Sequence, residues 1–331
     1  MNRRPTIRDV AEQAGVSIAT VSRVLNDRAD VSVETRERVR RVARSVGYSA
    51  DPAARGLVTQ RTQLVAVVVG DNAGHRDLSL LFFGKVMAAV SRRLARADYD
   101  SLLMQPDELG VHHRFDAAIL IGIDGSDPIV SGLWTRSIPH VGVDVRVAGR
   151  RGAFVGSDHA AGMRLALAHL HELGHHRIAH VAGARNTVAG ADRIAAFQRE
   201  TRLLGLEQRS DYLREADFSS AGGYQETRAL LALDERPTAI VAASDLMALA
   251  ALQAIREAGL EPGHDIAVVG FDDIEAAVLA HPPLTTVRQD RERLGTVAAE
   301  RALELIGRAD VRAADTILPV ELIVRGSSLP A

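Results

Sequence analysis

The sequence predicts a small all-α unit followed by a larger α/β region of two parallel sheets. In the first sixty or so residues the apolar positions recur at helical spacing, whereas from residue 64 onward short β-branched runs alternate with helical stretches. A chain of 331 residues is also long for one hydrophobic core, so more than one packed unit is expected.

Composition and missing motifs exclude several classes of function. No apolar stretch approaches the roughly 18 residues of a membrane helix, and the N-terminus does not resemble a signal peptide, so the cytoplasm is the expected location. The absence of cysteine excludes disulfides, thiolate zinc sites and a cysteine nucleophile. The paired histidines at 112–113 and 175–176 lack carboxylates at ligand spacing, so we expect no metal and no cofactor. Nucleotide-binding and nucleophile-elbow motifs are also missing, and no enzymatic activity is expected.

Charge is distributed unevenly along the chain. The net charge is −2, yet residues 1–60 hold eleven arginines against seven acidic residues. A basic head on an acidic body favours binding of a polyanion at the N-terminus. Surface solubility explains a modest excess of this kind equally well, so the charge alone does not decide.

Two short helices open the chain. Thr6, with Asp9 three residues later, is a capping box for the first helix, and Gly15 ends it. Ser17 caps a second helix that runs to about Leu25. The expected apolar faces of the two helices are made of Val10, Ala11, Ala14, Val21, Val24 and Leu25.

A third helix is expected over residues 32–46, with Val39, Val42 and Val46 inward and arginines around them. Three short helices with a glycine turn between the first two form a helix-turn-helix, whose second helix enters the major groove of DNA. Short polar side chains at the start of that helix grip phosphates, while projecting side chains meet base edges. A three-helix bundle with well-capped ends has the same pattern and remains the alternative.

From residue 64 the pattern changes to alternating strands and helices. Strands are expected at 64–69, 101–104, 117–121, 140–143, 177–183, 239–244 and 266–273. Helices are expected at 80–97, 160–173, 191–204, 221–233, 245–258 and 297–306, the last as core or dimer face. Such alternation implies parallel sheets covered on both faces, with a ligand in the crevice at the carboxyl ends of the strands.

The run TIRDVAEQAGVSIATVSRVLN (6–26), followed by VSVETRERVRRVARSVGYSADPAARGL (31–57), resembles the headpiece of the lactose/galactose repressor family of bacterial transcription regulators. The resemblance implies base-reading roles for Ile18, Ala19 and Arg23. Arg23 is the leading candidate, because a guanidinium bonds guanine in bidentate fashion. The family's phosphate-contacting positions are matched by Thr6, Ser17, Thr20, Ser22 and Asn26.

The segment 50–62 matches the family's hinge, which in relatives becomes a helix on DNA and wedges a leucine into the minor groove. Leu57 stands at the position of that leucine. Gly56 is a poor helix former, so the hinge is expected to be disordered until DNA and a partner hinge order it. An interdomain linker with an incidental leucine is the alternative.

The body carries the same resemblance over segments 155–183, 244–273 and 281–295. It implies a type I periplasmic-binding-protein-like domain of two parallel-sheet subdomains with an effector between them. The implied organisation is a helix-turn-helix headpiece, a hinge, and an effector-binding and dimerisation domain with crossovers near residues 157, 288 and 318. These three parts are expected at residues 1–49, 50–62 and 63–331.

The resemblance also implies ligand contacts. Arg193 and Asp272 match the family's main polar contacts, with an interdomain ion pair as the alternative. Phe218 falls where relatives stack an aromatic ring on the ligand, with burial in the core as the alternative. Looser matches to the cleft are Ser244, Gln289, Phe82 and Phe83.

Two departures from the family pattern lie in the first half of the body. Residues 70–83 differ from the usual motif after the first strand, and about one acidic helix is missing after residues 102–107. These departures bear on the near lip of the ligand site and on the dimer surface. They leave open a regulator that binds no small effector.

Together these features predict a homodimeric, sequence-specific transcription regulator, with repression the expected sign. It would bind a near-palindromic DNA operator, and a sugar or nucleobase-like effector would change its DNA affinity reciprocally. A solute-binding protein that retains its headpiece is an alternative. A sugar-processing enzyme is another, although no nucleophile or acid–base pair was found for it.

Overall fold

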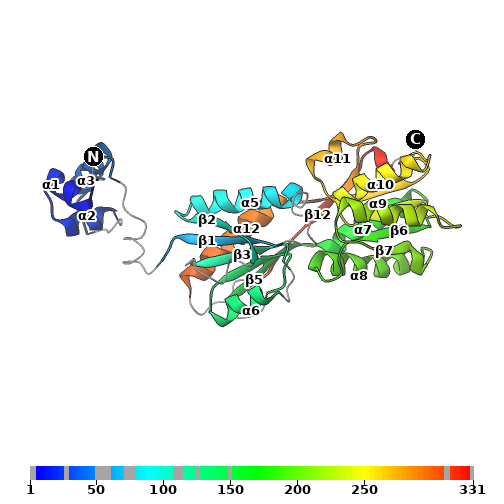
Figure 1. Ribbon diagram of the computed structural model, residues 1–331, viewed down its shortest axis with the longest axis horizontal. Coiled ribbons are helices and arrows are strands. Elements are labelled where there is room, and N and C mark those ends of the chain that lie inside the picture. Colours follow the sequence, from blue (N-terminus) through cyan, green and yellow to red (C-terminus); the bar gives the residue numbers. More distant parts are fainter. Residues whose placement is uncertain are drawn as a thin grey trace. The chain divides into compact units, whose positions relative to one another are not determined.

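Three helices are described in the N-terminal unit, and a larger α/β unit begins at Leu64 (Figure 1). The helices are α1 (Ile7–Ala14), α2 (Ile18–Leu25) and α3 (Val33–Ser45). The computed structural model describes residues 5–25, 30–48, 61–70, 80–106, 115–123, 127–147, 151–308 and 314–328.

The turn between α1 and α2 follows the expected capping chemistry. The Thr6 backbone amide and hydroxyl both donate to Asp9 Oδ2, at 2.6 and 2.8 Å. Gly15 adopts φ +63°, which glycine reaches without steric cost, and the chain turns there. The Thr20 amide then donates to Ser17 Oγ at 3.0 Å and caps α2. The expected helix-turn-helix is confirmed.

The headpiece core differs from the sequence expectation on α2, where Leu25 is only partly buried, and on α3. Val10, Val21, Val24 and Val39 are fully buried as expected. On α3, however, the second buried residue is Ala43. Val42 and Val46, which were expected to point inward, are only partly buried against the core. Residues three and four apart both lie near one helix face, and the approach of α3 to the other two helices puts Ala43 rather than Val42 in the core.

The first subdomain of the larger unit is a parallel sheet in the order β11-β5-β4-β3-β1-β2. Its strands are β1 (Leu64–Val69), β2 (Asp100–Met104), β3 (Ala117–Ile121), β4 (His140–Val143), β5 (Gly152–Ser157) and β11 (Thr316–Leu318). Helices α5 (Leu80–Ala95) and α12 (Arg291–Gly307) pack on one face and α6 (Pro128–Thr135) on the other. The helix expected at 297–306 is therefore core, as part of α12.

The second subdomain is a sheet in the order β12-β10-β9-β8-β6-β7, parallel except for the β10–β12 pair. Its strands are β6 (Ile178–Ala182), β7 (Leu213–Glu215), β8 (Ala239–Ala242), β9 (Ala267–Asp272), β10 (Thr285–Gln289) and β12 (Val320–Ile323). The covering helices are α7 (His159–Glu172), α8 (Val188–Leu203), α9 (Ser220–Leu231) and α10 (Asp245–Glu257), and the short α11 (Glu275–Leu279) follows β9.

The described chain passes between the two sheets three times: from β5 into α7, from β10 into α12, and from β11 into β12. In Figure 1 the orange α12 consequently lies among the cyan and green elements of the first subdomain. The carboxyl ends of β3 and β4 in one sheet and of β8 and β9 in the other border a shared pocket. This arrangement confirms the predicted fold class.

Candidate ligand pocket and DNA-contacting face

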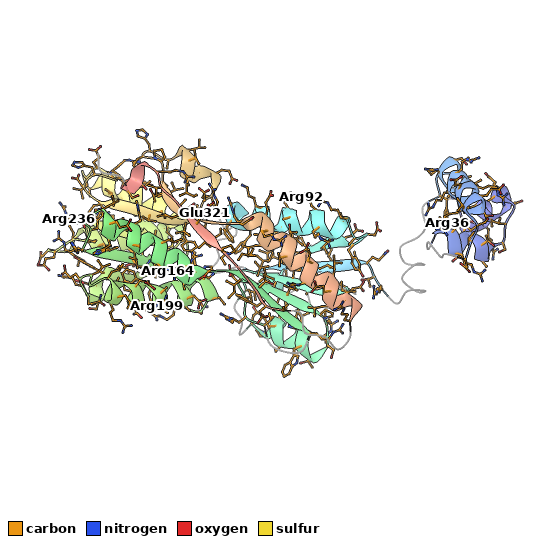
Figure 2. All side chains as sticks on the ribbon, turned by 180° about the vertical axis from the view of Figure 1, so that it is seen from behind. Arg36, Arg92, Arg164, Arg199, Arg236 and Glu321 are labelled. Carbon is orange, nitrogen blue, oxygen red and sulfur yellow. The ribbon has the colours of Figure 1, made fainter. Side chains whose placement is uncertain are left out.

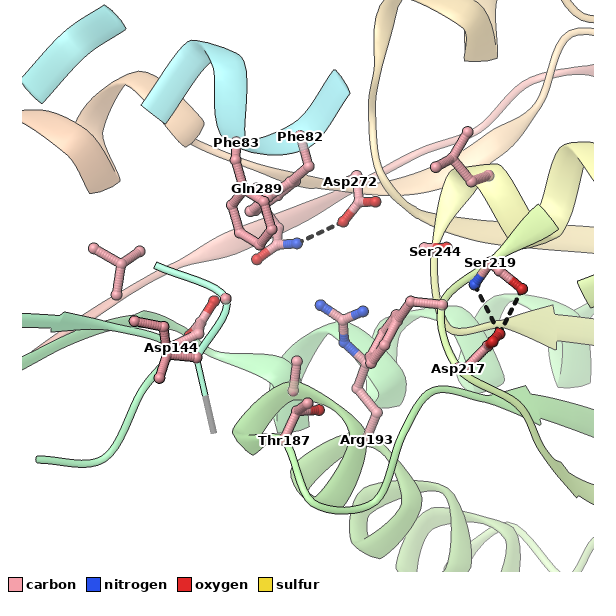
Figure 3. Close-up of a pocket in the computed structure, with 16 residues that line it drawn as sticks. Phe82, Phe83, Asp144, Thr187, Arg193, Asp217, Ser219, Ser244, Asp272 and Gln289 are labelled. Atoms are coloured by element: carbon pink, nitrogen blue, oxygen red, sulfur yellow. Dashed lines mark hydrogen bonds between the residues drawn. The ribbon is translucent and has the colours of Figure 1, made fainter. Parts of the chain in front are cut away.

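A pocket of about 140 Å³ lies between the two subdomains (Figure 3). Its lining comes from strand ends and helix starts of both sheets, which is where open α/β folds bind ligands. Every effector residue expected from the sequence lines this one pocket: Phe82, Phe83, Arg193, Phe218, Ser244, Asp272 and Gln289. The departures in residues 70–83 and after 102–107 therefore do not prevent the cleft from forming.

Arg193 projects from α8 into the centre of the pocket (Figure 3). It is 3% exposed, whereas Arg199 on the same helix points to solvent (Figure 2). Its Nη1 donates to the Ala243 carbonyl, and its guanidinium stacks 3.6 Å from the centre of the Phe271 ring. Burial lowers the pKa of Arg193, and nearby carboxylates led by Asp272 oppose that shift.

Asp272 ends β9, in the same subdomain as Arg193, and accepts a 2.8 Å hydrogen bond from Gln289 Nε2. Burial raises the pKa of this carboxyl, while the positive charge of Arg193 and the Gln289 contact lower it. No direct Arg193–Asp272 ion pair is formed among the described residues. Both groups therefore keep hydrogen-bonding capacity toward the space between them.

Two buried polar atoms of the lining have no hydrogen-bond partner among the described residues. They are the Arg193 Nε donor and the Gln289 Oε1 acceptor. A buried polar group without a partner costs roughly 1–3 kcal/mol. One donor and one acceptor left open in the same pocket fit a ligand that both accepts and donates hydrogen bonds, as a hydroxyl does.

Strained backbone also concentrates at the pocket. Among its described lining residues, Asp144, Phe218 and Asp272 have φ values of +51°, +67° and +134°. Residues other than glycine avoid this region, and such strain collects where a site must hold side chains in fixed directions.

Aromatic rings supply the apolar part of the lining. Phe82 and Phe83 meet edge to face, with ring centres 5.2 Å apart, and both also pack on the first-subdomain core. Phe218 lines the pocket and packs against the second-subdomain core, so both alternatives for this residue hold. Gly183 makes its position possible, because a Cβ there would lie 2.0 Å from the Phe218 ring.

Sequence reasoning missed a relay beside Arg193. Arg193 Nη2 donates to His159 Nδ1 at 3.2 Å, which leaves His159 Nε2 to donate to Asp144 Oδ1 at 3.1 Å. Arg193 and His159 belong to the second subdomain and Asp144 to the first. The relay thus joins the two subdomains next to the pocket.

It also missed Asp245, which is fully buried and interacts electrostatically with Asp272. Its two oxygens accept from Thr286 Oγ1 at 2.5 Å and from the Ile274 amide at 2.8 Å. Burial, followed by the charge of Asp272, raises the pKa of Asp245. The feature of the sequence that could have identified Asp245 is its position directly after Ser244. Ser244 caps α10 by accepting from the Met247 amide.

Ion pairs between surface side chains also cross between the subdomains. Lys85 of α5 pairs with Glu275 of α11. On the other side Arg146, just after β4, lies 4.0 Å from Asp192 of α8. These side chains are about half exposed, so each pair contributes little on its own.

On the headpiece, the residues expected to read bases share the exposed face of α2. Ile18 is 44% exposed, Ala19 is exposed, and the Arg23 side chain is 59% exposed. Of the expected phosphate contacts, Thr6 and Ser17 are exposed at helix starts, and Thr20 and Ser22 are partly buried. Asn26 and Leu57 lie outside the described residues.

Two features are absent from the described residues. None of their helices is long and apolar enough to cross a membrane. Nor do they contain a group of three or more side chains able to hold a metal ion.

Comparisons with known proteins agree on one relationship. A family model described as "Bacterial regulatory proteins, lacI family" matches residues 6–51, and one described as "Periplasmic binding protein-like domain" matches residues 167–328. The HTH-type transcriptional regulator CelR of Thermobifida fusca is 34% identical over 98% of this chain and 98% of its own length.

Solved structures extend the similarity to the fold. A lac repressor dimer bound to operator and the anti-inducer ONPF has a TM-score of 0.83 at 32% identity, over 99% of this chain and 100% of that chain. A complex of the regulator CelR with cellobiose has a TM-score of 0.75 at 32% identity, over 98% of this chain and 100% of that chain.

Proposed function

The chain belongs to the lacI family of bacterial regulatory proteins, and we propose that it is a dimeric transcriptional repressor controlled by a small ligand in the cleft. The observation that carries the ligand part is the convergence of the expected contact residues on one pocket between the subdomains. In a regulator that binds no small ligand, the buried Arg193 Nε and Gln289 Oε1 would stay without hydrogen-bond partners among the described residues, which is unfavourable.

For DNA, we assign the recognition role to α2. Arg23, with Ile18 and Ala19 beside it, would read base edges in the major groove, while residues at the helix starts hold phosphates. A two-fold symmetric dimer requires a two-fold symmetric operator, so each subunit takes one half-site. Residues 1–49 would be the DNA-binding part, 50–62 the hinge with Leu57 as its minor-groove wedge, and 63–331 the ligand-binding and dimerisation part.

For the ligand, we infer a neutral, polyhydroxylated compound such as a sugar. Among the described residues the lining contains Asp144, Asp217 and Asp272 but only one arginine, Arg193, which disfavours an anionic ligand. Hydroxyls would bond Asp272 and the open atoms of Arg193 and Gln289, while the phenylalanines cover an apolar face. The relative CelR binding cellobiose is consistent with this class. A nucleobase-like ligand, which also stacks on aromatic rings, is the competing class.

Ligand binding would act through the subdomains. A ligand that contacts both subdomains changes the position of one subdomain relative to the other. In the dimer, that change would alter the spacing of the two headpieces. Because coupling is reciprocal, DNA must change the ligand's affinity by the same factor that the ligand changes DNA affinity. Reading DNA in a bacterial cell places the protein in the cytoplasm.

The first test is a selection of genomic fragments by the purified full-length protein at moderate salt. A shared palindrome supports the repressor proposal, and neighbouring genes for sugar uptake or breakdown support the ligand class. A thermal-shift screen of neutral sugars, sugar phosphates and nucleobases then separates the ligand classes. Fragments without a common motif, in the presence and absence of the stabilising compound, would refute sequence-specific DNA binding.

A further inference from the structure

An acidic side chain lies beside the proposed base-reading arginine. Asp30 follows α2 in the chain, and its Oδ2 is 3.7 Å from Arg23 Nε. Both side chains are 59% exposed, so the pair sits on the surface of the headpiece. An exposed pair of this kind contributes little to stability, but the Asp30 charge acts directly on the Arg23 guanidinium.

The backbone that carries Asp30 is fixed from the following residues. Val31 is partly buried against the headpiece core, and its carbonyl accepts from Arg36 Nη2 at 3.5 Å (Arg36 is labelled in Figure 2). Ser32 then caps α3, with its Oγ accepting from the Thr35 amide at 3.4 Å. The carboxylate is therefore presented to Arg23 from an anchored position.

The contact involves the inner nitrogen of the guanidinium. Arginine has five N–H donors, and Nε is the guanidinium nitrogen nearest the Asp30 carboxylate, so the terminal nitrogens, Nη1 and Nη2, lie farther from that charge. Two terminal donors are what the O6 and N7 acceptors of guanine require for an end-on bidentate contact. A carboxylate on Nε thus restrains the side chain without blocking the atoms that would read the base.

We propose that Asp30 is a specificity-determining residue, which orients Arg23 toward guanine and reduces its attraction to phosphates. This inference rests on the proposed function, in which Arg23 reads a base. Orientation favours the correct base pair, because less side-chain freedom is lost on contact. The negative charge of Asp30 weakens binding to any sequence, because nonspecific binding is dominated by phosphate contacts.

The two effects predict opposite changes for Asp30→Asn. Affinity for nonspecific DNA rises, whereas discrimination at the base pair read by Arg23 falls about two- to fivefold per half-site, the range for an exposed ion pair. Because a symmetric operator contains two half-sites, its discrimination falls about 4- to 25-fold. Arg23→Ala removes the reader itself, so adding Asp30→Asn to it should cause no further loss of discrimination.

The test uses the full-length dimer and a library of duplex oligonucleotides with a randomised core. The wild-type protein first selects its preferred palindrome. Dissociation constants are then measured for that palindrome, for the same duplex with the Arg23-dependent guanine replaced in both halves, and for a scrambled duplex. The control is Glu37→Gln, which removes the same charge from an exposed site on α3 and should strengthen binding to all three duplexes equally.

Unchanged discrimination in Asp30→Asn, with wild-type discrimination clearly present, would overturn the inference and leave the repressor proposal intact. An equal shift of all three duplexes, as in the control, would also overturn it, because that is the effect of charge alone. If the wild-type protein selects no palindrome, the proposed function fails first and the inference fails with it.

Discussion

The sharpest test of the pocket is Asp272→Asn. The substitution is isosteric, and asparagine Oδ1 can still accept from Gln289 Nε2, so the wall keeps its shape. What changes is the charge. Replacing a charge-assisted hydrogen bond by a neutral one costs about 1 kcal/mol, so a ligand that donates two hydroxyls to this carboxylate loses about 2 kcal/mol. That corresponds to an increase of about 30-fold in the Kd of the ligand.

The same change should not harm the fold. Burial raises the pKa of Asp272, which means that the folded protein disfavours its ionised form. Removing that charge therefore removes a desolvation cost, and Arg193 still faces the carboxylates of Asp144 and Asp245. The free energy of unfolding at neutral pH is expected to stay unchanged or to rise.

The assay is isothermal titration calorimetry with the neutral sugar that stabilises the wild-type protein most in a thermal-shift screen. Asp234→Asn, at an exposed position away from the pocket, is the matched control and should bind like wild type. DNA affinity without ligand should be retained in both variants. A wild-type Kd for the sugar in Asp272→Asn would refute the reasoning, since the carboxylate would then make no contact with the ligand.

Three further predictions concern the aromatic lining of the pocket, a buried histidine and the headpiece. Gly183→Ala places a methyl group against the Phe218 ring, so the ring must move. Calorimetry should then show at least about a tenfold loss of ligand affinity. Unchanged affinity would show that Phe218 does not contact the ligand. Burial lowers the pKa of His180 to about 4, so the folded protein keeps this side chain neutral while the unfolded chain protonates it below about pH 6.5. The stability that depends on neutral His180 is therefore complete above pH 6.5 and is lost as the pH falls toward 4. Urea unfolding should give a free energy of unfolding about 2 kcal/mol lower near pH 5 than near pH 7 on account of His180. The variant His180→Phe should lose that part of the pH dependence. If the variant keeps the same pH dependence as wild type, His180 is not its source. Arg23→Ala should relax the selected DNA motif at one position in each half-site by a factor of about 10, and an unchanged motif would exclude it as the reader.

Local chemistry explains why the headpiece was predictable. The capping box of Thr6 and Asp9, the left-handed turn at Gly15 and the cap at Ser17 involve neighbours in the chain, so their residue types and spacing are sufficient. The choice between Val42 and Ala43 was not of this kind. It depends on how closely α3 approaches the other two helices, which is a tertiary property.

The pocket was predictable only where its residues match the family motifs. Asp144, His159 and Asp245 escaped notice because each takes its role from a partner on another element. Asp144 meets His159 across the subdomain boundary, and Asp245 meets Thr286 from 41 positions further along the chain. The strands β5, β7, β10, β11 and β12 were not expected from the sequence, and for the shortest two, β7 and β11, the reason is length. Three residues each are too few for any alternation to show.

The late position of α12 and β11 in the chain has a consequence for synthesis on the ribosome. The first sheet needs α12 to cover one face and β11 to complete its edge, yet both follow the whole second subdomain in sequence (Figure 1). When the first strands of the second sheet emerge from the ribosome, α12 has not yet been made. The apolar residues of β1, β3 and β4 that pack against α5 and α12 are then covered by α5 alone. A nascent chain is thus exposed to aggregation, and to chaperones, until α12 and β11 have left the exit tunnel.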